Sequence, residues 1–499
     1  MDTKRLYAIV AACAVVVYVG ALWNQFVIDD IPLIVTNPLV TGPAGIWRAF
    51  GAPYWPPDMG GHSYRPLTIA TFAVDRLLDG AVWFHAVNLL WHAAASVAVA
   101  ALARRWADTA GAGALVAGVL FAVHPVHVEA VASVVGRADL MAALFAVLAV
   151  YAALVRQAVG WSAAAWVLGL LSKESAAVVP ALVVWAWMLG LARPDRRRMA
   201  LFVASWAVVG GAYAVARGVV LHPFAGLQSI GAMFLGESPA TVRLTGVAAL
   251  ADVARLLVFP LTLRVDYSPN ERTVVTSPLD PRFALGLLCA LLWGALLVAA
   301  WKRDRKLEAF GLGWIGVALL PVANLLYPVG FYVAERTLYL PSAGLVLAAA
   351  GALARLPRER LRAVVAALAV LGGVRTALRV PVWRNDVAVA LSVMDDSPRS
   401  YVGPKWMIGY YLDERQPAKA LAAARIAAGI YDRDPTIYVT AAVAAFAAGD
   451  SRGADSLLAE LERLCHRCGG YYRREAALAR AHGYMAAADS LLARSPAGP

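Results

Sequence analysis

Two adjacent carboxylates, Asp29 and Asp30, follow the first apolar segment of this 499-residue chain. That segment, residues 6–23, carries no charge, and Lys4 and Arg5 precede it. The positive-inside rule predicts a membrane anchor with a cytoplasmic N-terminus, which places the pair at the outer face of the membrane. A carboxylate there could take a proton from an attacking hydroxyl group. The pair therefore predicts general-base chemistry outside the cytoplasm, and the alternative is that it only caps the following loop.

Further cations lie in short polar stretches between apolar windows, where ionisable groups are costly and indicate function. A cation at the outer end of a span could stabilise a phosphate whose negative charge grows as a bond to it breaks. We expect Arg137, Lys173 and Arg336 to bind such a phosphate. The alternative for each is a snorkelling or ion-paired residue, with Glu174 and Glu335 as the evident partners of Lys173 and Arg336.

Other ionisable or hydrogen-bonding side chains are expected on the same outer face. His124, His127 and Glu129 could ligate a metal, but packing and hydrogen bonding at a helix end is the favoured interpretation. We therefore predict no metal site, although dependence on a divalent metal stays open. The full set of these further candidates is Tyr64, Arg65, His124, His127, Glu129, Asp139, Glu174 and Glu335.

The elements that must position these residues are membrane helices. Hydrophobic residues make up 61% of the chain, charged residues 16%, and the mean hydropathy is +0.63. Such a composition excludes a soluble globular domain and predicts an all-α polytopic membrane protein. The first segment lacks a clear small-residue cleavage site, so we expect an anchor that is retained rather than a signal peptide.

Eleven apolar windows are long enough to predict transmembrane helices. The window at residues 246–261 is interrupted by Asp252 and Arg255, which predicts a re-entrant or interfacial helix instead. The eleven predicted spans lie near residues 6–23, 84–103, 109–123, 138–157, 158–171, 175–192, 199–218, 283–301, 308–327, 338–354 and 361–378.

The basic residues between these windows fall on one side of the predicted membrane. The net charge of +12 therefore mainly serves to orient the chain in the membrane. No nucleic-acid recognition module is visible in the sequence. An odd number of spans places the chain beyond about residue 380 on the same side as Asp29 and Asp30. The predicted location is the cell (inner) membrane, with a cytoplasmic N-terminus and an extracytoplasmic C-terminal region.

The C-terminal region, residues 395–499, has an internal repeat. The sequence at residues 454–459 recurs at residues 488–493, an offset of 34, and Gly449 recurs as Gly483. Thirty-four residues is the tetratricopeptide period. About three degenerate repeats are predicted, which would form either a concave platform for an acceptor or protein partner or a packing cap on the membrane domain.

Two of the four cysteines lie outside the predicted spans, in Cys465-His466-Arg467-Cys468. On the outer side a disulfide between Cys465 and Cys468 would persist, and this is the favoured prediction. Free thiols, a redox role and a metal role remain alternatives, the last without two further visible ligands.

The ordered set of motifs resembles the transmembrane and tetratricopeptide-repeat O-mannosyltransferases of the C-type glycosyltransferase superfamily. The motifs are at residues 29–30, 64–67, 124–131, 136–139, 171–174, 265–268 and 334–341. The resemblance covers essentially the whole chain, with a transferase domain at residues 1–380 and a shorter repeat region than in animal members.

That resemblance implies a polyprenyl-phosphate-mannose donor and transfer of its sugar to an acceptor hydroxyl. The donor is a substrate rather than a cofactor. The resemblance also implies that Asp29 occupies the catalytic acidic position, with Asp30 beside it. The predicted partners are the lipid bilayer, this donor, and an acceptor protein or glycan that the repeats could hold. The alternatives are a lipid-linked sugar transporter and a non-catalytic membrane scaffold. The high content of alanine, valine and arginine also suggests a bacterial genome of high GC content. The identities of the sugar and of the acceptor are inferred from the resemblance alone.

Overall fold

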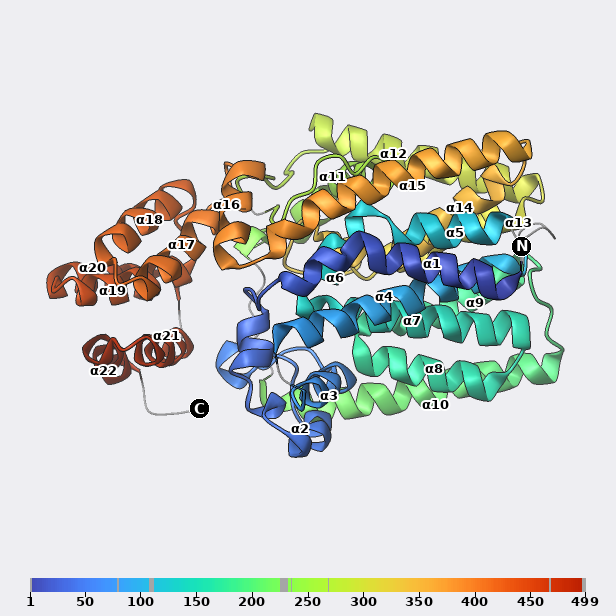
Figure 1. The fold of residues 1–499 in the computed structure, drawn as a ribbon. Coiled ribbons are helices and arrows are strands. Elements are labelled where there is room, and N and C mark those ends of the chain that lie inside the picture. The colour runs from blue at the N-terminus through green and yellow to red at the C-terminus, as the bar shows by residue number, and fades with distance from the viewer. Residues whose placement is uncertain are drawn as a thin grey trace.

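The computed structural model describes residues 2–78, 80–106, 112–224, 232–234, 236–267, 269–465 and 468–495, and over these residues it is helical, without a strand. The first three residues of the window at 109–123, Ser268 of the 265–268 motif and the two residues inside the cysteine motif therefore lie outside the described residues. Figure 1 shows a long bundle of helices with a separate array of shorter helices beyond one end.

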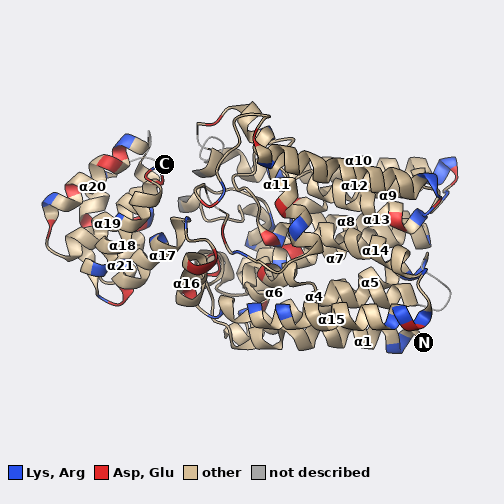
Figure 2. Ribbon diagram, turned by 90° about the horizontal axis from the view of Figure 1, so that it is seen from above, with Lys and Arg blue, Asp and Glu red and all other residues tan. Residues whose placement is uncertain are grey.

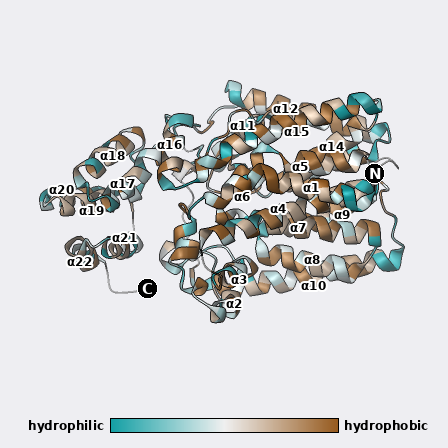
Figure 3. Cartoon of the chain, in the orientation of Figure 1, coloured by the Kyte–Doolittle hydropathy of each residue, from teal (hydrophilic) through white to brown (hydrophobic). Residues whose placement is uncertain are grey.

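Each of the eleven predicted windows coincides with one helix of the bundle. These helices are α1 (Thr3–Tyr18), α4 (Ala81–Arg104), α5 (Ala112–Ala122), α7 (Arg137–Tyr151), α8 (Val159–Ser172), α9 (Val179–Met188), α10 (Arg196–Leu221), α12 (Pro281–Lys302), α13 (Lys306–Leu319), α14 (Tyr339–Leu353) and α15 (Arg358–Arg379). The hydrophobic colouring in Figure 3 follows them along the bundle.

The number of membrane crossings is a separate question, because a helix must be about 20 apolar residues long to span the bilayer. In the described part of the chain, seven helical segments meet that requirement by length and composition. An eighth is counted if α5 and the segment Pro125–Ala132, which bend by 45° at their junction, form one span. The chain is thus a multi-pass membrane protein, and the count of eleven spans stays a prediction.

The window at 246–261 lies within a single helix, α11 (Pro239–Val258), which packs against α12. Both helices begin with a capping residue followed by proline, a sequence typical of a helix start. Ser238 Oγ accepts a hydrogen bond from Thr241 N at 3.1 Å, and Asp280 Oδ1 accepts one from Arg282 N at 2.8 Å. Whether α11 is re-entrant or interfacial stays a prediction.

Small residues allow the bundle helices to pack backbone to backbone. A Cβ atom added at Gly311 on α13 would lie 2.3 Å from the carbonyl oxygen of Gly344 on α14, so neither position has room for a side chain. Close helix approach at small residues is a common basis of packing inside membranes. The N-terminal segment of α14 is thereby held against α13.

Charged residues are distributed unequally between the two ends of the bundle. Figure 2 shows Lys and Arg gathered at the end that carries the N-terminus, and a mixed group of acidic and basic residues near α6 (Val128–Ala132) at the opposite end. The short helices of the first loop, α2 (Pro43–Arg48) and α3 (Pro66–Asp75), also lie toward that opposite end in Figure 1. This distribution agrees with the predicted one-sided basic excess, while the compartment that each end faces stays a prediction.

The array beyond the bundle consists of antiparallel helix pairs. Its helices are α16 (Asp386–Asp396), α17 (Val402–Asp413), α18 (Pro417–Ile430), α19 (Pro435–Ala447), α20 (Ser451–Leu464), α21 (Gly469–Ala481) and α22 (Met485–Arg494). The starts of α18, α20 and α22, at Pro417, Ser451 and Met485, are spaced at the offset of 34 residues found in the sequence. The array has its own hydrophobic core, and its assignment as tetratricopeptide repeats stays a prediction.

Turns within the array repeat as well. Gly449 and Gly483 both have φ of +79°, in the left-handed region that glycine adopts without steric cost. Cys465 and Cys468 form a disulfide across the α20–α21 connection, with their Cα atoms 5.5 Å apart, as the sequence predicted.

Candidate active site

The loop after the first span holds its two carboxylates in different environments. Asp30 is fully buried, and its carboxylate accepts hydrogen bonds from Val27 N at 3.0 Å, Val135 N at 2.8 Å and Val134 N at 3.4 Å. Burial raises the pKa of Asp30 to about 7, although these N–H donors oppose the shift. Asp30 therefore attaches the loop to the connection before α7.

Asp29 is half-buried, and among the described residues its carboxylate accepts no hydrogen bond. Burial raises its pKa, Glu129 adds to the shift, and the positive charges of Arg336, Arg474 and Lys405 oppose it. Asp29 is thus the member of the pair that remains available to an external hydroxyl.

The backbone beside Asp29 is strained. Ile28 has φ of +49°, a region that a β-branched residue rarely adopts, and its N–H donates to Asp386 Oδ1 at 2.8 Å. Such strain persists only where the surroundings impose it and is common at functional sites. The first residue of α16 therefore helps to hold the Asp29 loop in place.

Arg336 lies in the turn before α14 and is bound to α6. Its guanidinium pairs with Glu129, and its backbone N–H donates to the same carboxylate at 2.8 Å. The Glu129 side chain is 4% exposed, whereas that of Arg336 is 36% exposed and can still accept a ligand. Arg336 is thus ion-paired, as the alternative interpretation allowed, but its partner is not the neighbouring Glu335, which is buried and accepts hydrogen bonds from Arg264 N at 2.5 Å and Tyr267 Oη at 3.0 Å.

Two more ion pairs complete the cluster. Lys173 Nζ binds both oxygens of Asp139 at 2.7 Å, and Arg65 binds Glu174 through two hydrogen bonds of 3.0 and 2.6 Å. The expected pairing of Lys173 with Glu174 is therefore wrong, since adjacent side chains at a helix start diverge. Lys173 is within electrostatic range of Arg65 and Arg336, so the three pairs are neighbours.

Arg137 differs from these cations because no part of it is exposed. Its guanidinium pairs with Asp75, donates to Asn88 Oδ1 at 2.8 Å and Phe84 O at 3.0 Å, and lies over the Phe72 ring at 4.7 Å. These contacts match the ion-paired alternative that the sequence left open. Phosphate binding by Arg137 would require it to leave this site.

The histidines and the tyrosine of the candidate set are bonded to the protein. His124 Nε2 lies 2.9 Å from Leu257 O, His127 Nε2 lies 2.7 Å from Ser342 Oγ, and Tyr64 Oη donates to Phe50 O at 2.9 Å. Within the described ranges, no three His, Cys, Asp or Glu side chains converge on a point that could hold a metal ion.

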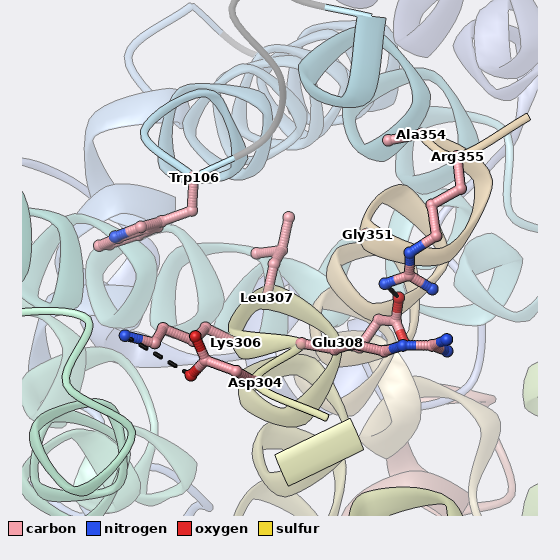
Figure 4. A pocket seen from close by; sticks show the side chains of 9 residues that line it. Trp106, Asp304, Lys306, Leu307, Glu308, Gly351, Ala354 and Arg355 are labelled. Atoms are coloured by element: carbon pink, nitrogen blue, oxygen red, sulfur yellow. Dashed lines mark hydrogen bonds and ion pairs between the residues drawn. The ribbon is translucent and has the colours of Figure 1, made fainter. Parts of the chain in front are cut away.

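A hollow of about 290 Å³ lies at the opposite end of the bundle and is separate from this cluster (Figure 4). Its cations already have partners: Lys306 Nζ is 3.7 Å from Asp304, and Arg355 pairs with Glu308. It therefore does not contribute to the candidate active site.

Sequence reasoning missed four contributors: Asp75, Asp386, Lys405 and Arg474. Asp75 and Asp386 stand alone in their segments and give no signal. Arg474 could have been found, because Trp406, Thr440 and Arg474 are spaced by the repeat offset and line one cavity.

Fold and site together define a multi-pass membrane protein whose buried and half-buried ion pairs converge at one end of the helix bundle. The chain is similar over most of its length to protein O-mannosyl-transferases. It is 29% identical over 455 residues to the human protein O-mannosyl-transferase TMTC4, an alignment that covers 78% of this chain and 61% of that protein. It is 28% identical over 354 residues to a protein O-mannosyl-transferase of Caenorhabditis elegans, which covers 69% of this chain and 50% of that protein.

A third relative, protein O-mannosyl-transferase Tmtc2 of Drosophila melanogaster, is 34% identical over 336 residues, 62% of this chain and 34% of its own length. The chain thus spans about half to three fifths of the first two relatives. No family model and no solved structure matches it.

Proposed function

We propose that this protein transfers mannose from a polyprenyl-phosphate donor to a serine or threonine hydroxyl of a protein, on the extracytoplasmic face of the cell membrane. The observation that carries the proposal is that the carboxylate of Asp29, which accepts no hydrogen bond among the described residues, lies within electrostatic range of Arg336, whose side chain is 36% exposed. The names of the relatives supply the sugar and the acceptor class.

The chemistry assigns one task to each of these groups. Asp29 takes the proton of the acceptor hydroxyl as the hydroxyl oxygen bonds to C1 of the sugar. The bond from C1 to the phosphate oxygen breaks, and the electron pair leaves with the polyprenyl phosphate. Arg336 stabilises the charge that develops on that phosphate, and the positive charges of Lys173 and Arg65, which are within electrostatic range, add to this effect. Glu129 and Asp139 hold Arg336 and Lys173 in position.

The test uses the purified full chain in lipid nanodiscs, a labelled polyprenyl-phosphate-mannose and a serine-containing peptide. Asp29→Asn should lower kcat by roughly 10²–10⁴-fold, the usual contribution of a general base, without loss of thermal stability. Because burial raises the pKa of Asp29, the wild-type kcat/KM should fall on acidification at a pH above the ordinary carboxyl value of about 4.

The matched control is Asp30→Asn, which keeps the size and removes the charge of the neighbouring side chain. Since Asp30 accepts three backbone hydrogen bonds, this variant should lose thermal stability rather than proton transfer. Near wild-type turnover by Asp29→Asn would overturn the role of Asp29. In sealed liposomes, a wild-type protein that moves the donor across the membrane without transfer would indicate a transporter, and one that does neither would indicate a scaffold.

A further inference from the structure

The helical array contains a cavity of about 360 Å³ on the side formed by α17, α19 and α21. This volume is within the range of small-ligand sites. Concave faces of stacked helix pairs are common binding surfaces. Its wall is more apolar than polar, and the ionisable or hydroxyl residues in it include Lys405, Asp413, Thr440, Arg474, Glu475 and His482.

Two basic residues in this wall, Lys405 and His482, have acidic partners within the protein. Lys405 Nζ binds Asp434 at 3.0 Å, and His482 Nδ1 is 2.7 Å from Asp413. Glu475 is buried, which raises its pKa, while the charge of Arg474 and a hydrogen bond from Thr440 oppose the shift. Arg474 is half-buried, and among the residues that the structure describes its guanidinium has no hydrogen bond or ion pair.

The cavity is also next to the candidate active site. Arg474 and Lys405 both act electrostatically on Asp29 across the interface. α21 contacts the turn at Pro57–Met59 of the first loop, and the start of α16 binds the Ile28 backbone. A further contact joins the array to the segment after α11, where Ser400 Oγ donates to Asp266 Oδ2 at 2.7 Å. The array is therefore attached to the bundle around the Asp29 loop.

We propose that this cavity binds an extended acceptor segment that carries an aspartate or glutamate near the hydroxyl residue, with Arg474 as the group that holds the acidic side chain. A guanidinium recognises a carboxylate through two parallel hydrogen bonds, and among the described residues of this wall Arg474 is the cation whose hydrogen-bond donors are not already used. The hydroxyl groups of Thr436 and Thr440 donate to Asp434 and Glu475, and their oxygens can accept hydrogen bonds from backbone N–H groups of the segment. The inference rests on the proposed function and names its acceptor class.

The experiment measures binding alone, by fluorescence anisotropy with the full chain in nanodiscs and no donor present. The probes are two labelled serine peptides that differ only in an aspartate or an asparagine two residues from the serine. Arg474→Ala should raise the Kd of the aspartate peptide about tenfold, equivalent to about 1.4 kcal/mol, and leave the asparagine peptide unchanged. A third peptide, with lysine at that position, should bind to Arg474→Glu more tightly than the aspartate peptide does.

The matched control is Arg452→Ala, which removes an exposed arginine of α20 outside the cavity and should change neither Kd. Equal weakening of both peptides by Arg474→Ala, or no binding of either peptide to the wild-type protein, would overturn this inference and leave the donor chemistry untouched. Normal peptide discrimination by a wild-type protein that shows no transfer from the donor would instead overturn the proposed function alone.

Discussion

Arg137 and Arg336 both lie at the ends of apolar helices on the same side of the bundle, yet their surroundings differ. Arg137 is enclosed by Asp75, Asn88 and Phe84, whereas Arg336 keeps a third of its side chain exposed. Removing one partner of a buried ion pair leaves an uncompensated charge, which costs about 3–5 kcal/mol. Arg137 is therefore a structural residue and Arg336 is the candidate for contact with the donor.

We accordingly expect Arg137→Ala and Asp75→Asn to lower the yield and thermal stability of the protein in detergent, while Arg336→Gln retains the fold and loses transfer activity. The measurement is thermal unfolding followed by size-exclusion fluorescence, with the transfer assay on the folded fraction. A folded Arg137→Ala protein of wild-type stability, with activity lowered as in Arg336→Gln, would restore Arg137 to the phosphate site.

At the scale of the element, we expect opposite effects from replacing two glycines of the helical array, one in a turn and one in a helix. Gly449 has φ of +79°, where a side chain is strained whatever the space around it, so Gly449→Ala should destabilise the array by about 1 kcal/mol. Gly429 lies inside α18 with open space around it, so Gly429→Ala should stabilise by about 0.5–1 kcal/mol. Hydrogen exchange of peptides from α18 to α21 reports both changes, and shifts of the same sign would contradict this account.

Helices were predictable from the sequence to a greater extent than the contacts between them. Each of the eleven apolar windows located a helix of the bundle, and the recurrence of Gly449 as Gly483 located two turns of the array. Both signals could be used because they are local in the sequence. The partner of Arg336 was not predictable, since Glu129 lies 207 residues away and a neighbouring carboxylate offered a simpler choice. The separate roles of Asp29 and Asp30 likewise depend on amides from the connection before α7.

At the scale of the whole molecule, the candidate site and the array lie at one end of the bundle and the N-terminus at the other (Figure 1). A reporter inserted near Gly60 and one fused after residue 499 should therefore both be active in the exported compartment of a bacterial host. An insertion at Asp304, in the turn before α13, is the matched control and should be active in the cytoplasm. Signals from Gly60 and Asp304 in the same compartment would contradict this topology.

The pairing of Glu129 with Arg336 also has a consequence for biosynthesis. The two residues are 207 positions apart, and ribosomes add about 5–20 residues per second, so Glu129 emerges roughly 10–40 s before its counter-ion. An unpaired carboxylate is costly inside the bilayer. During this interval α5 and the segment Pro125–Ala132 are synthesised while the cation that compensates Glu129 is still missing. The ion pair between α6 and the turn before α14 can therefore form only after Arg336 has been synthesised, which joins the two halves of the site late in biosynthesis.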